Sequence, residues 1–191
     1  MKEQVRMVVT LTAFCLVAGG LLAWTNSVTK APIENACRAE LVAALKEVLP
    51  PFDNDVVADA VTVEDNGRRW TNFVARRQGE FVGAAFECRA DGYGGPIRAL
   101  VGVRSDNTVY AVVILQADKE TPGLGSKIKD KRFLSQFSGK SVLDRRWSAV
   151  KKDGGEIDAI TGATISSRAV AQAVKTGLEV YARHFEEIRG K

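Results

Sequence analysis

The sequence predicts an α+β fold: one N-terminal transmembrane helix, then a single domain in which helices flank a largely antiparallel, twisted sheet. Three observations lead to this prediction. An apolar run lies near the N-terminus, five short strand-like runs occupy the middle of the chain, and an amphipathic helix lies near its end. With 191 residues, of which 46% are hydrophobic, the chain is long enough for one modest domain with its own core.

The run Met7–Trp24 carries no charge and is largely apolar. As a helix it would span about 27 Å, close to the thickness of the hydrocarbon core of a bilayer. Lys2 and Arg6 precede the run, so the positive-inside rule places the N-terminus in the cytoplasm. A cleaved signal peptide has similar features around a shorter run and remains the alternative. We therefore expect residues 1–30 to form a cytoplasmic tip and a transmembrane anchor in a bacterial inner membrane, and residues 31–191 to form a periplasmic domain.

The other elements follow from periodicity and turn residues. Glu34–Leu49 has apolar residues at helical spacing and stops at a pair of prolines. Five runs typical of strands follow, separated by turn-forming residues that indicate hairpins: Val56–Val63, Trp70–Ala75, Phe81–Arg89, Arg98–Val103 and Val109–Leu115. A last helix is expected over Ser167–Ile188, with Ser166 or Ser167 as its N-cap. Its buried face would consist of Val170, Val174, Leu178, Tyr181, Phe185 and Ile188.

Charge and residue content exclude several classes of function. The 27 Lys and Arg against 23 Asp and Glu leave a net charge of +4, half of it near the N-terminus, so nucleic acid is not an expected partner. The basic stretch Lys127–Lys152 is interpreted as a solvated surface, with a partner-facing role as the alternative. Three cysteines without C-x-x-C spacing argue against structural zinc, and Cys37 and Cys88 are left unpaired. One histidine, His184, leaves little for a catalytic His triad or for a multi-histidine metal or haem site, and no catalytic acid–base constellation appears in the sequence.

Three short motifs remain: GYGGPI at Gly92–Ile97, ETPGLG at Glu120–Gly125, and D-x-x-T-G-A-T at Asp158–Thr164. Taken singly, each has an ordinary interpretation as a glycine-rich hairpin turn, a type II turn or the loop before a helix. The third motif opens onto a predicted helix N-terminus, where free amides and the helix dipole favour a phosphate. Leu124 is an apolar tip suited to lie against a flat ring.

In this order the motifs resemble the FMN-binding domain family whose flavin is covalently attached. The whole chain is similar to the G subunit of Rnf ion-translocating electron-transport complexes and to the C subunit of sodium-translocating NADH:quinone reductases. The resemblance implies that Thr164 accepts FMN through a phosphoester to its hydroxyl, with Asp158 belonging to the flavinylation motif. It further implies a set of cofactor-binding residues: Glu120, Thr121, Gly123, Leu124, Gly125, Thr161, Gly162 and Ala163.

The resemblance also implies a function and partners. A periplasmic flavin transferase would make the covalent bond, using FAD and a divalent metal that is needed for maturation and not in the finished domain. The chain would be a membrane-anchored electron carrier in a complex that couples ferredoxin/NAD electron transfer to ion translocation. Its partners would be the other subunits and the lipid bilayer, and it would not be catalytic alone. Two alternatives stay open: a non-redox assembly or sensor module, and a flavin domain of another membrane reductase.

Overall fold

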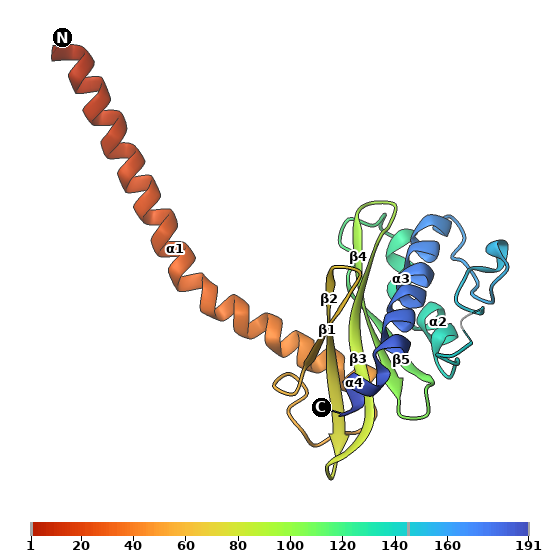
Figure 1. Ribbon diagram of the computed structural model, residues 1–191. Coiled ribbons are helices and arrows are strands. Elements are labelled where there is room, and N and C mark those ends of the chain that lie inside the picture. The colour runs from red at the N-terminus through yellow and green to blue at the C-terminus, as the bar shows by residue number, and fades with distance from the viewer. Residues whose placement is uncertain (1, 145, 191) are drawn as a thin grey trace. The chain divides into compact units, whose positions relative to one another are not determined.

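The N-terminal part of the chain is one long helix. The computed structural model describes residues 2–144 and 146–190, and it divides into two compact units, Met1–Leu41 and Val42–Lys191. Helix α1, Lys2–Val48, runs without a break through both predicted helical pieces, with Pro32 inside it (Figure 1). Among the described residues it is the one helix long and apolar enough to cross a membrane. Its large apolar side chains near the N-terminus, such as Leu11 and Phe14, are exposed, as a lipid-facing surface requires.

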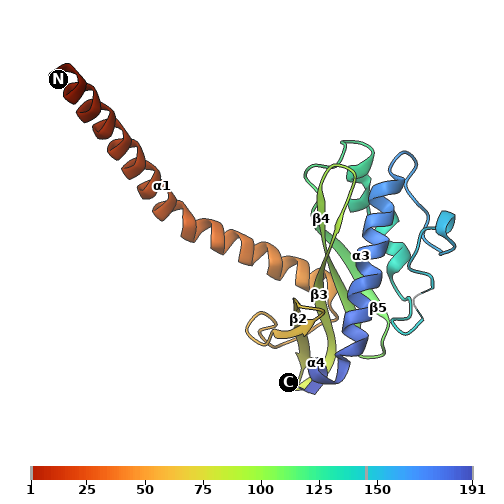
Figure 2. The same cartoon turned by 45° about the horizontal axis from the view of Figure 1, so that its top comes forward.

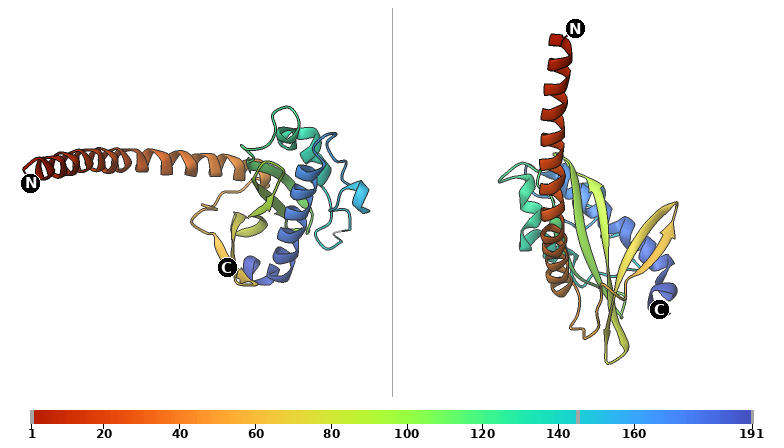
Figure 3. Two further views of the ribbon diagram at one scale, coloured as in Figure 1. Left: turned by 90° about the horizontal axis from the view of Figure 1, so that it is seen from above. Right: turned by 90° about the vertical axis from the view of Figure 1, so that its left-hand side faces the viewer.

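The second unit is built on one five-stranded sheet. Its strands pair in sequence order, and every neighbouring pair is antiparallel, which confirms the predicted hairpins and antiparallel sheet. The sheet is strongly twisted, as the right-hand view of Figure 3 shows. The strands are β1 (Val61–Asp65), β2 (Arg68–Arg77), β3 (Glu80–Asp91), β4 (Pro96–Arg104) and β5 (Val109–Gln116). Three of the connecting turns place Asn66, Gln78 and Asn107 at positive φ, in the turns that the sequence predicts.

The prediction of a first strand over Val56–Val63 is wrong for the first half of that range. Strand β1 begins only at Val61, and the preceding residues form a turn. The carboxylate of Asp55 accepts hydrogen bonds from the amides of Val57 at 3.1 Å and Ala58 at 3.2 Å. This local pairing offers the backbone an alternative to the sheet ladder, so an apolar run after an aspartate does not extend as a strand.

One face of the sheet is covered by α3, Thr164–Arg183, which packs on β3 and β4 and runs along the sheet in Figure 2. The apolar face predicted for the helix Ser167–Ile188 is buried, except that Phe185 is only partly buried. A Cβ at Gly177 would collide with the ring of Phe86 on β3, so glycine lets the helix approach the sheet closely. The predicted single helix is interrupted at His184, after which α4 spans Phe185–Gly190.

Short helices join α3 on this face. Their apolar side chains, including Ile128, Phe133 and Phe137, belong to the same core cluster as α3 and β5. The helices are η1 (Gly125–Lys129), α2 (Lys131–Leu134), η2 (Ser135–Phe137) and η3 (Lys151–Asp153). This segment follows β5 directly, so it carries the chain from the last strand to the start of α3.

The opposite face of the sheet meets the last turn of α1. Phe86 faces α3, and neighbouring strand residues alternate between faces, so Gly102, paired with Ala85, points to the other side. There Leu45 and Val48 are fully buried, and a Cβ at Gly102 would collide with the carbonyl oxygen of Val48. The end of α1 therefore belongs to the core of the domain.

Glu87 lies on this second face, between Arg89 at 2.7 Å and Arg98 at 2.8 Å. Burial acts to raise the pKa of its carboxyl, but hydrogen bonds from Arg98 and Arg89 outweigh burial and hold the pKa below its ordinary value of 4.5. In the pH range between the two pKa values the folded state therefore binds fewer protons than the unfolded state. The stabilisation from these ion pairs is fully present above about pH 4.5 and is lost as pH falls through the lowered pKa.

We therefore expect Glu87→Gln to lower the free energy of unfolding by up to about 1 kcal/mol at pH 7. At pH 3 the loss should be smaller, because the stabilisation from these ion pairs declines as pH falls below the ordinary pKa of 4.5. Urea unfolding of both proteins at the two pH values measures the difference. An equal loss at pH 7 and pH 3 would show that the charge of Glu87 does not contribute.

Candidate functional site

The three motifs meet in one cleft of about 560 Å³ within the second unit. One side is the turn between β3 and β4, another is the turn that follows β5, and the third is the beginning of α3. Its volume lies in the usual range for small-molecule sites, about 300–1,000 Å³. The cleft is lined by Tyr93, Glu120, Thr121, Leu124, Gly125, Gly162, Ala163, Thr164, Ile165 and Ser166.

Thr164 is the first residue of α3, not a residue of the preceding loop. The predicted N-caps Ser166 and Ser167 are wrong, because the N-cap is Ala163 and both serines lie inside the first turn. The Ser167 hydroxyl donates to the Ala163 carbonyl at 2.9 Å and accepts from the Ile160 amide at 3.0 Å, which ties the loop to the helix. The methyl group of Ala163 cannot cap the helix. The positive end of the helix therefore lies beside Thr164, with first-turn amides that have no intrahelical partner.

Apolar side chains frame the mouth of the cleft. Leu124 is 43% exposed at the tip of its turn, and a Cβ at Gly162 would lie only 3.0 Å from its Cδ2. Gly162 has φ = +79°, so both its conformation and the space under Leu124 favour glycine. Tyr93 and Ile165 are 71% and 52% exposed. Three unpacked apolar side chains around one cleft are what a flat, partly apolar ligand needs.

Glu120 differs from its neighbours because it points into the protein. It is 5% exposed, and its carboxylate accepts hydrogen bonds from the Ser166 hydroxyl at 2.5 Å and from the Gly94 amide at 3.2 Å. It therefore forms part of the wall of the cleft. Gly123 is not among the lining residues; its amide donates to the Ser126 hydroxyl at 2.9 Å and closes the turn that presents Leu124.

Asp158 and Thr161 lie in a different hollow, of about 500 Å³, together with residues such as Lys127 and Gln136. The Asp158 amide donates to Gln136 Oε1 at 2.7 Å, and its carboxylate pairs with Lys151 at 2.8 Å. The structure therefore brings most of the predicted cofactor-binding residues to Thr164, but it does not place these two beside it.

Sequence reasoning misses three residues of the cleft: Tyr93, Ile165 and Ser166. The sequence contains a signal that could have identified Tyr93 as a site residue. It is an aromatic residue between glycines in the predicted turn of the first motif, where packing in a hydrophobic core does not explain it. Ile165 and Ser166 directly follow the third motif, where the sequence alone indicates helix packing or capping. Only the start of α3 at Thr164 shows that they turn toward the cleft.

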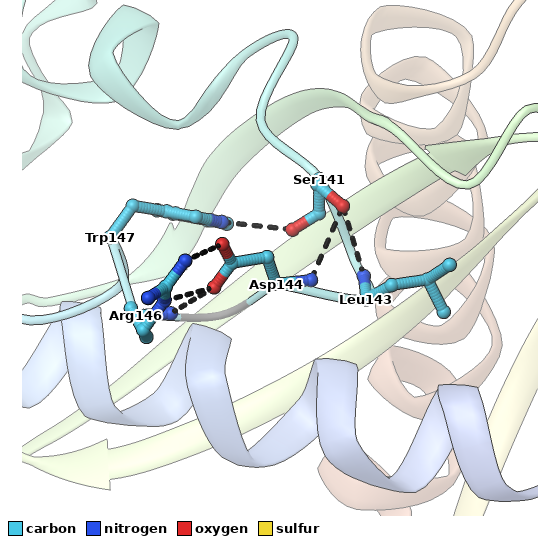
Figure 4. Close-up of polar contacts among 5 residues, drawn as sticks. All are labelled: Ser141, Leu143, Asp144, Arg146 and Trp147. Carbon is cyan, nitrogen blue, oxygen red and sulfur yellow. Dashed lines mark hydrogen bonds and ion pairs between the residues drawn. The ribbon is translucent and has the colours of Figure 1, made fainter.

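The described residues of the basic stretch, 127–144 and 146–152, do not line this cleft. Within it, the loop in Figure 4 is held by internal contacts: the Trp147 indole N–H donates to the Ser141 carbonyl at 2.8 Å, and Arg146 pairs with Asp144 at 2.6 Å. Lys140 pairs with Glu156, and Lys129 lies 3.6 Å from Asp118. Such exposed ion pairs are typical of a solvated surface.

The two cysteines that could have paired are free. Cys37 is exposed on α1, while Cys88 is fully buried in β3. Burial raises the pKa of the Cys88 thiol to about 12, so at neutral pH it stays protonated and unreactive.

Comparison with known proteins places these features in a family. The family model described as "FMN-binding domain" matches residues 92–179, which include all lining residues of the cleft, and the model "RnfG N-terminal region" matches residues 2–48. The G subunit of the ion-translocating oxidoreductase complex of Photorhabdus laumondii is 40% identical over 179 residues, 87% of this chain and 85% of that protein. The corresponding G subunit of Yersinia pestis is 40% identical over 187 residues, 92% of this chain and 88% of that protein.

Solved structures share the fold. Shewanella oneidensis NqrC superposes with a TM-score of 0.54 at 23% identity and covers 73% of this chain and 76% of its own. The C subunit of the Na⁺-translocating NADH-quinone reductase from Parabacteroides distasonis gives a TM-score of 0.54 at 25% identity, over 76% of this chain and 82% of its own. With relatives at 40% identity over most of its length, the chain belongs to the family of G subunits of ion-translocating oxidoreductase complexes.

Proposed function

We propose that this chain is the membrane-anchored electron-carrier subunit of an Rnf-type complex and that it carries FMN bound covalently to Thr164. The observation that supports this most is the position of Thr164. It is the first residue of α3, it lines the cleft, and the uncapped end of the helix lies beside it. Phosphate is favoured at such a helix N-terminus, so a phosphoester at this hydroxyl would be stabilised by the surrounding amides.

The residues of the cleft fit this cofactor. Gly162 and Ala163 carry little or no side chain beside Thr164, which leaves room for a phosphate and its ribityl chain. Leu124, Tyr93 and Ile165 would cover the apolar faces of the ring and limit its contact with water. FMN supplies the electron-transfer chemistry, while the protein binds and orients it. This division explains how the site can work without a catalytic acid or base.

Relatives support the setting of this function. Proteins of the family are named as subunits of ion-translocating oxidoreductase complexes, so we propose other subunits of such a complex as partners and electron transport coupled to ion translocation as the role. The apolar helix α1 supports a single-pass membrane anchor.

We further propose that the residues up to 30 comprise a cytoplasmic tip and the anchor, and that residues 31–191 form a periplasmic domain. In the periplasm a flavin transferase would attach FMN to this domain. Protease added to spheroplasts should digest the domain, and full protection of the domain would contradict this topology.

The proposed function is tested by expressing the full chain with and without the flavin transferase. We expect a band that shows flavin fluorescence after denaturing electrophoresis only when the transferase is present. A colourless band under both conditions would contradict a covalent flavin carrier and favour the non-redox alternative.

Leu124→Ala should leave covalent FMN at wild-type stoichiometry but change the flavin absorption spectrum. Burial of a leucine side chain is typically worth about 1.5–3 kcal/mol, and part of that contact with the ring is lost while the bond at Thr164 holds the cofactor. We expect the midpoint potential of the flavin to shift by about 30 mV. A tenfold change in a one-electron equilibrium constant corresponds to 59 mV, so this shift is roughly a threefold change.

The matched control for this variant is Leu143→Ala, because Leu143 is also exposed, at 69%, but does not line the cleft. Spectrum and potential should be unchanged in the control. If Leu124→Ala is equally silent, the turn that carries Leu124 does not contact the ring.

A further inference from the structure

One buried carboxylate connects the first two motifs with the first turn of α3. Glu120 is the one buried acidic or basic residue in the part of the chain that the structure describes. A buried carboxylate is costly unless hydrogen bonds replace its hydration. Glu120 has two such bonds, and each joins it to a different segment of the chain.

The first bond comes from the Ser166 hydroxyl, 46 residues away in the first turn of α3, at a donor–acceptor distance of 2.5 Å. The second comes from the Gly94 amide, in the turn between β3 and β4, at 3.2 Å. The carboxylate therefore holds two sides of the cleft to the third.

The glycines of two motifs leave the space that this arrangement needs. A Cβ at Gly92 would collide with one carboxylate oxygen of Glu120, and a Cβ at Gly125 would collide with the other. A Cβ at Gly94 would collide with the backbone carbonyl of Lys119. Backbone atoms and a carboxylate held by two hydrogen bonds cannot move aside at low cost. These three glycines therefore serve the packing around Glu120.

From these contacts we propose that Glu120 is a positioning residue of the flavin site. Its carboxylate does not contact the cofactor; it fixes the turn that carries Tyr93 and the helix start that carries Thr164 on two sides of one cleft. This differs from the direct flavin contact that the family resemblance implies for Glu120. The part of the proposal that concerns flavin rests on the proposed function, while the fixing of the loops is a property of the domain before it is loaded.

The experiment compares Glu120→Ala, Glu120→Gln and Ser166→Ala in the full-length protein. Glutamine keeps the size of the side chain and can still accept from Gly94 while pairing with Ser166, so it separates shape from charge. Ser166→Ala removes one of the two bonds with a small change, which keeps the test valid if Glu120→Ala does not fold. Glu87→Ala is the matched control, because it removes a hydrogen-bonded carboxylate from the opposite face of the sheet.

Two measurements are made on each variant. In the protein without flavin, hydrogen exchange reports the protection of the Gly94 amide and of the residues around it. Mass analysis then gives the rate at which purified transferase and FAD load Thr164. We expect Glu120→Ala to speed exchange at Gly94 and to slow loading, each by about tenfold or more, since small misplacements of a reacting group have effects of that size. Ser166→Ala should slow loading less, Glu120→Gln should restore it to near the wild-type rate, and Glu87→Ala should change neither quantity.

The outcomes separate the two proposals. Wild-type exchange and wild-type loading in Glu120→Ala would overturn the positioning role. Slow loading with wild-type exchange, or failure of Glu120→Gln to restore loading, would also overturn it, because the carboxylate would then act directly on flavin or transferase. If the wild-type protein takes up no FMN at all while exchange at Gly94 rises in Glu120→Ala, the proposed function fails and the structural role of Glu120 stands.

Discussion

We expect Thr164→Val to yield a folded protein that carries no covalent FMN when it is expressed with the flavin transferase. Valine keeps the branched shape of threonine and deletes only the hydroxyl that would form the phosphoester. Thr164 is partly exposed at the start of α3, so the substitution removes no buried contact and should change stability by only about 0.5 kcal/mol. Intact-mass analysis of the purified protein measures the result directly.

The matched control is Thr161→Val, three residues earlier and in the neighbouring hollow, which should retain the added FMN mass. If Thr164→Val still carries FMN, the attachment lies elsewhere. Ser166 would then be a poor candidate, because it is 1% exposed and bonded to Glu120, so Thr161 would be the residue to test next.

Gly102→Ala should lower the stability of the domain strongly. A Cβ at this position of β4 would collide with the carbonyl oxygen of Val48, a backbone atom at the end of α1 that cannot rotate away. Overpacking of this kind typically costs about 1–3 kcal/mol. For a domain of this size each kcal/mol lowers the melting temperature by about 2–4 °C, so we expect a fall of about 2–12 °C.

Thermal unfolding of the detergent-solubilised full chain, followed by circular dichroism, measures this effect. Gly190→Ala is the control, since a Cβ there meets no atom within 4 Å and the residue lies at the end of α4. Equal melting temperatures for the two variants would show that the end of α1 is not held against β4.

Much of the fold could be predicted because its signals are local. Strands β2, β3 and β4 each contain an unbroken run of buried residues, and turn residues such as Asn66 and Asn107 separate the strands, so the sequence indicates both the strands and their antiparallel pairing. It predicts the start of α3 three residues late, at Ser167, because serine is a good N-cap by propensity. In the structure that hydroxyl serves the Ile160–Ala163 loop instead, an arrangement that depends on how the loop folds back.

The candidate site, too, could be predicted from the sequence only in part. The motif residues Thr121, Leu124, Gly162 and Thr164 all line the cleft, as their shared motifs suggest. The inward orientation of Glu120 could not be predicted, since its partners Gly94 and Ser166 are 26 and 46 residues away and no periodic pattern links them. The location of Asp158 in a separate hollow could not be predicted either, because it depends on contacts with Gln136 and Lys151.

The order of the strands has a consequence for how the protein matures. Because the order of the strands in the sheet follows the sequence from β1 to β5, each strand pairs with the strand that precedes it in the chain. Topologies with such local contacts fold rapidly. The cleft, in contrast, needs α3, which lies near the C-terminal end of the chain. A nascent chain can thus complete its sheet well before it presents Thr164 at a helix start. If Thr164 carries the cofactor as proposed, loading would thereby be tied to the end of synthesis, and a chain cut short before α3 would leave the transferase nothing to modify.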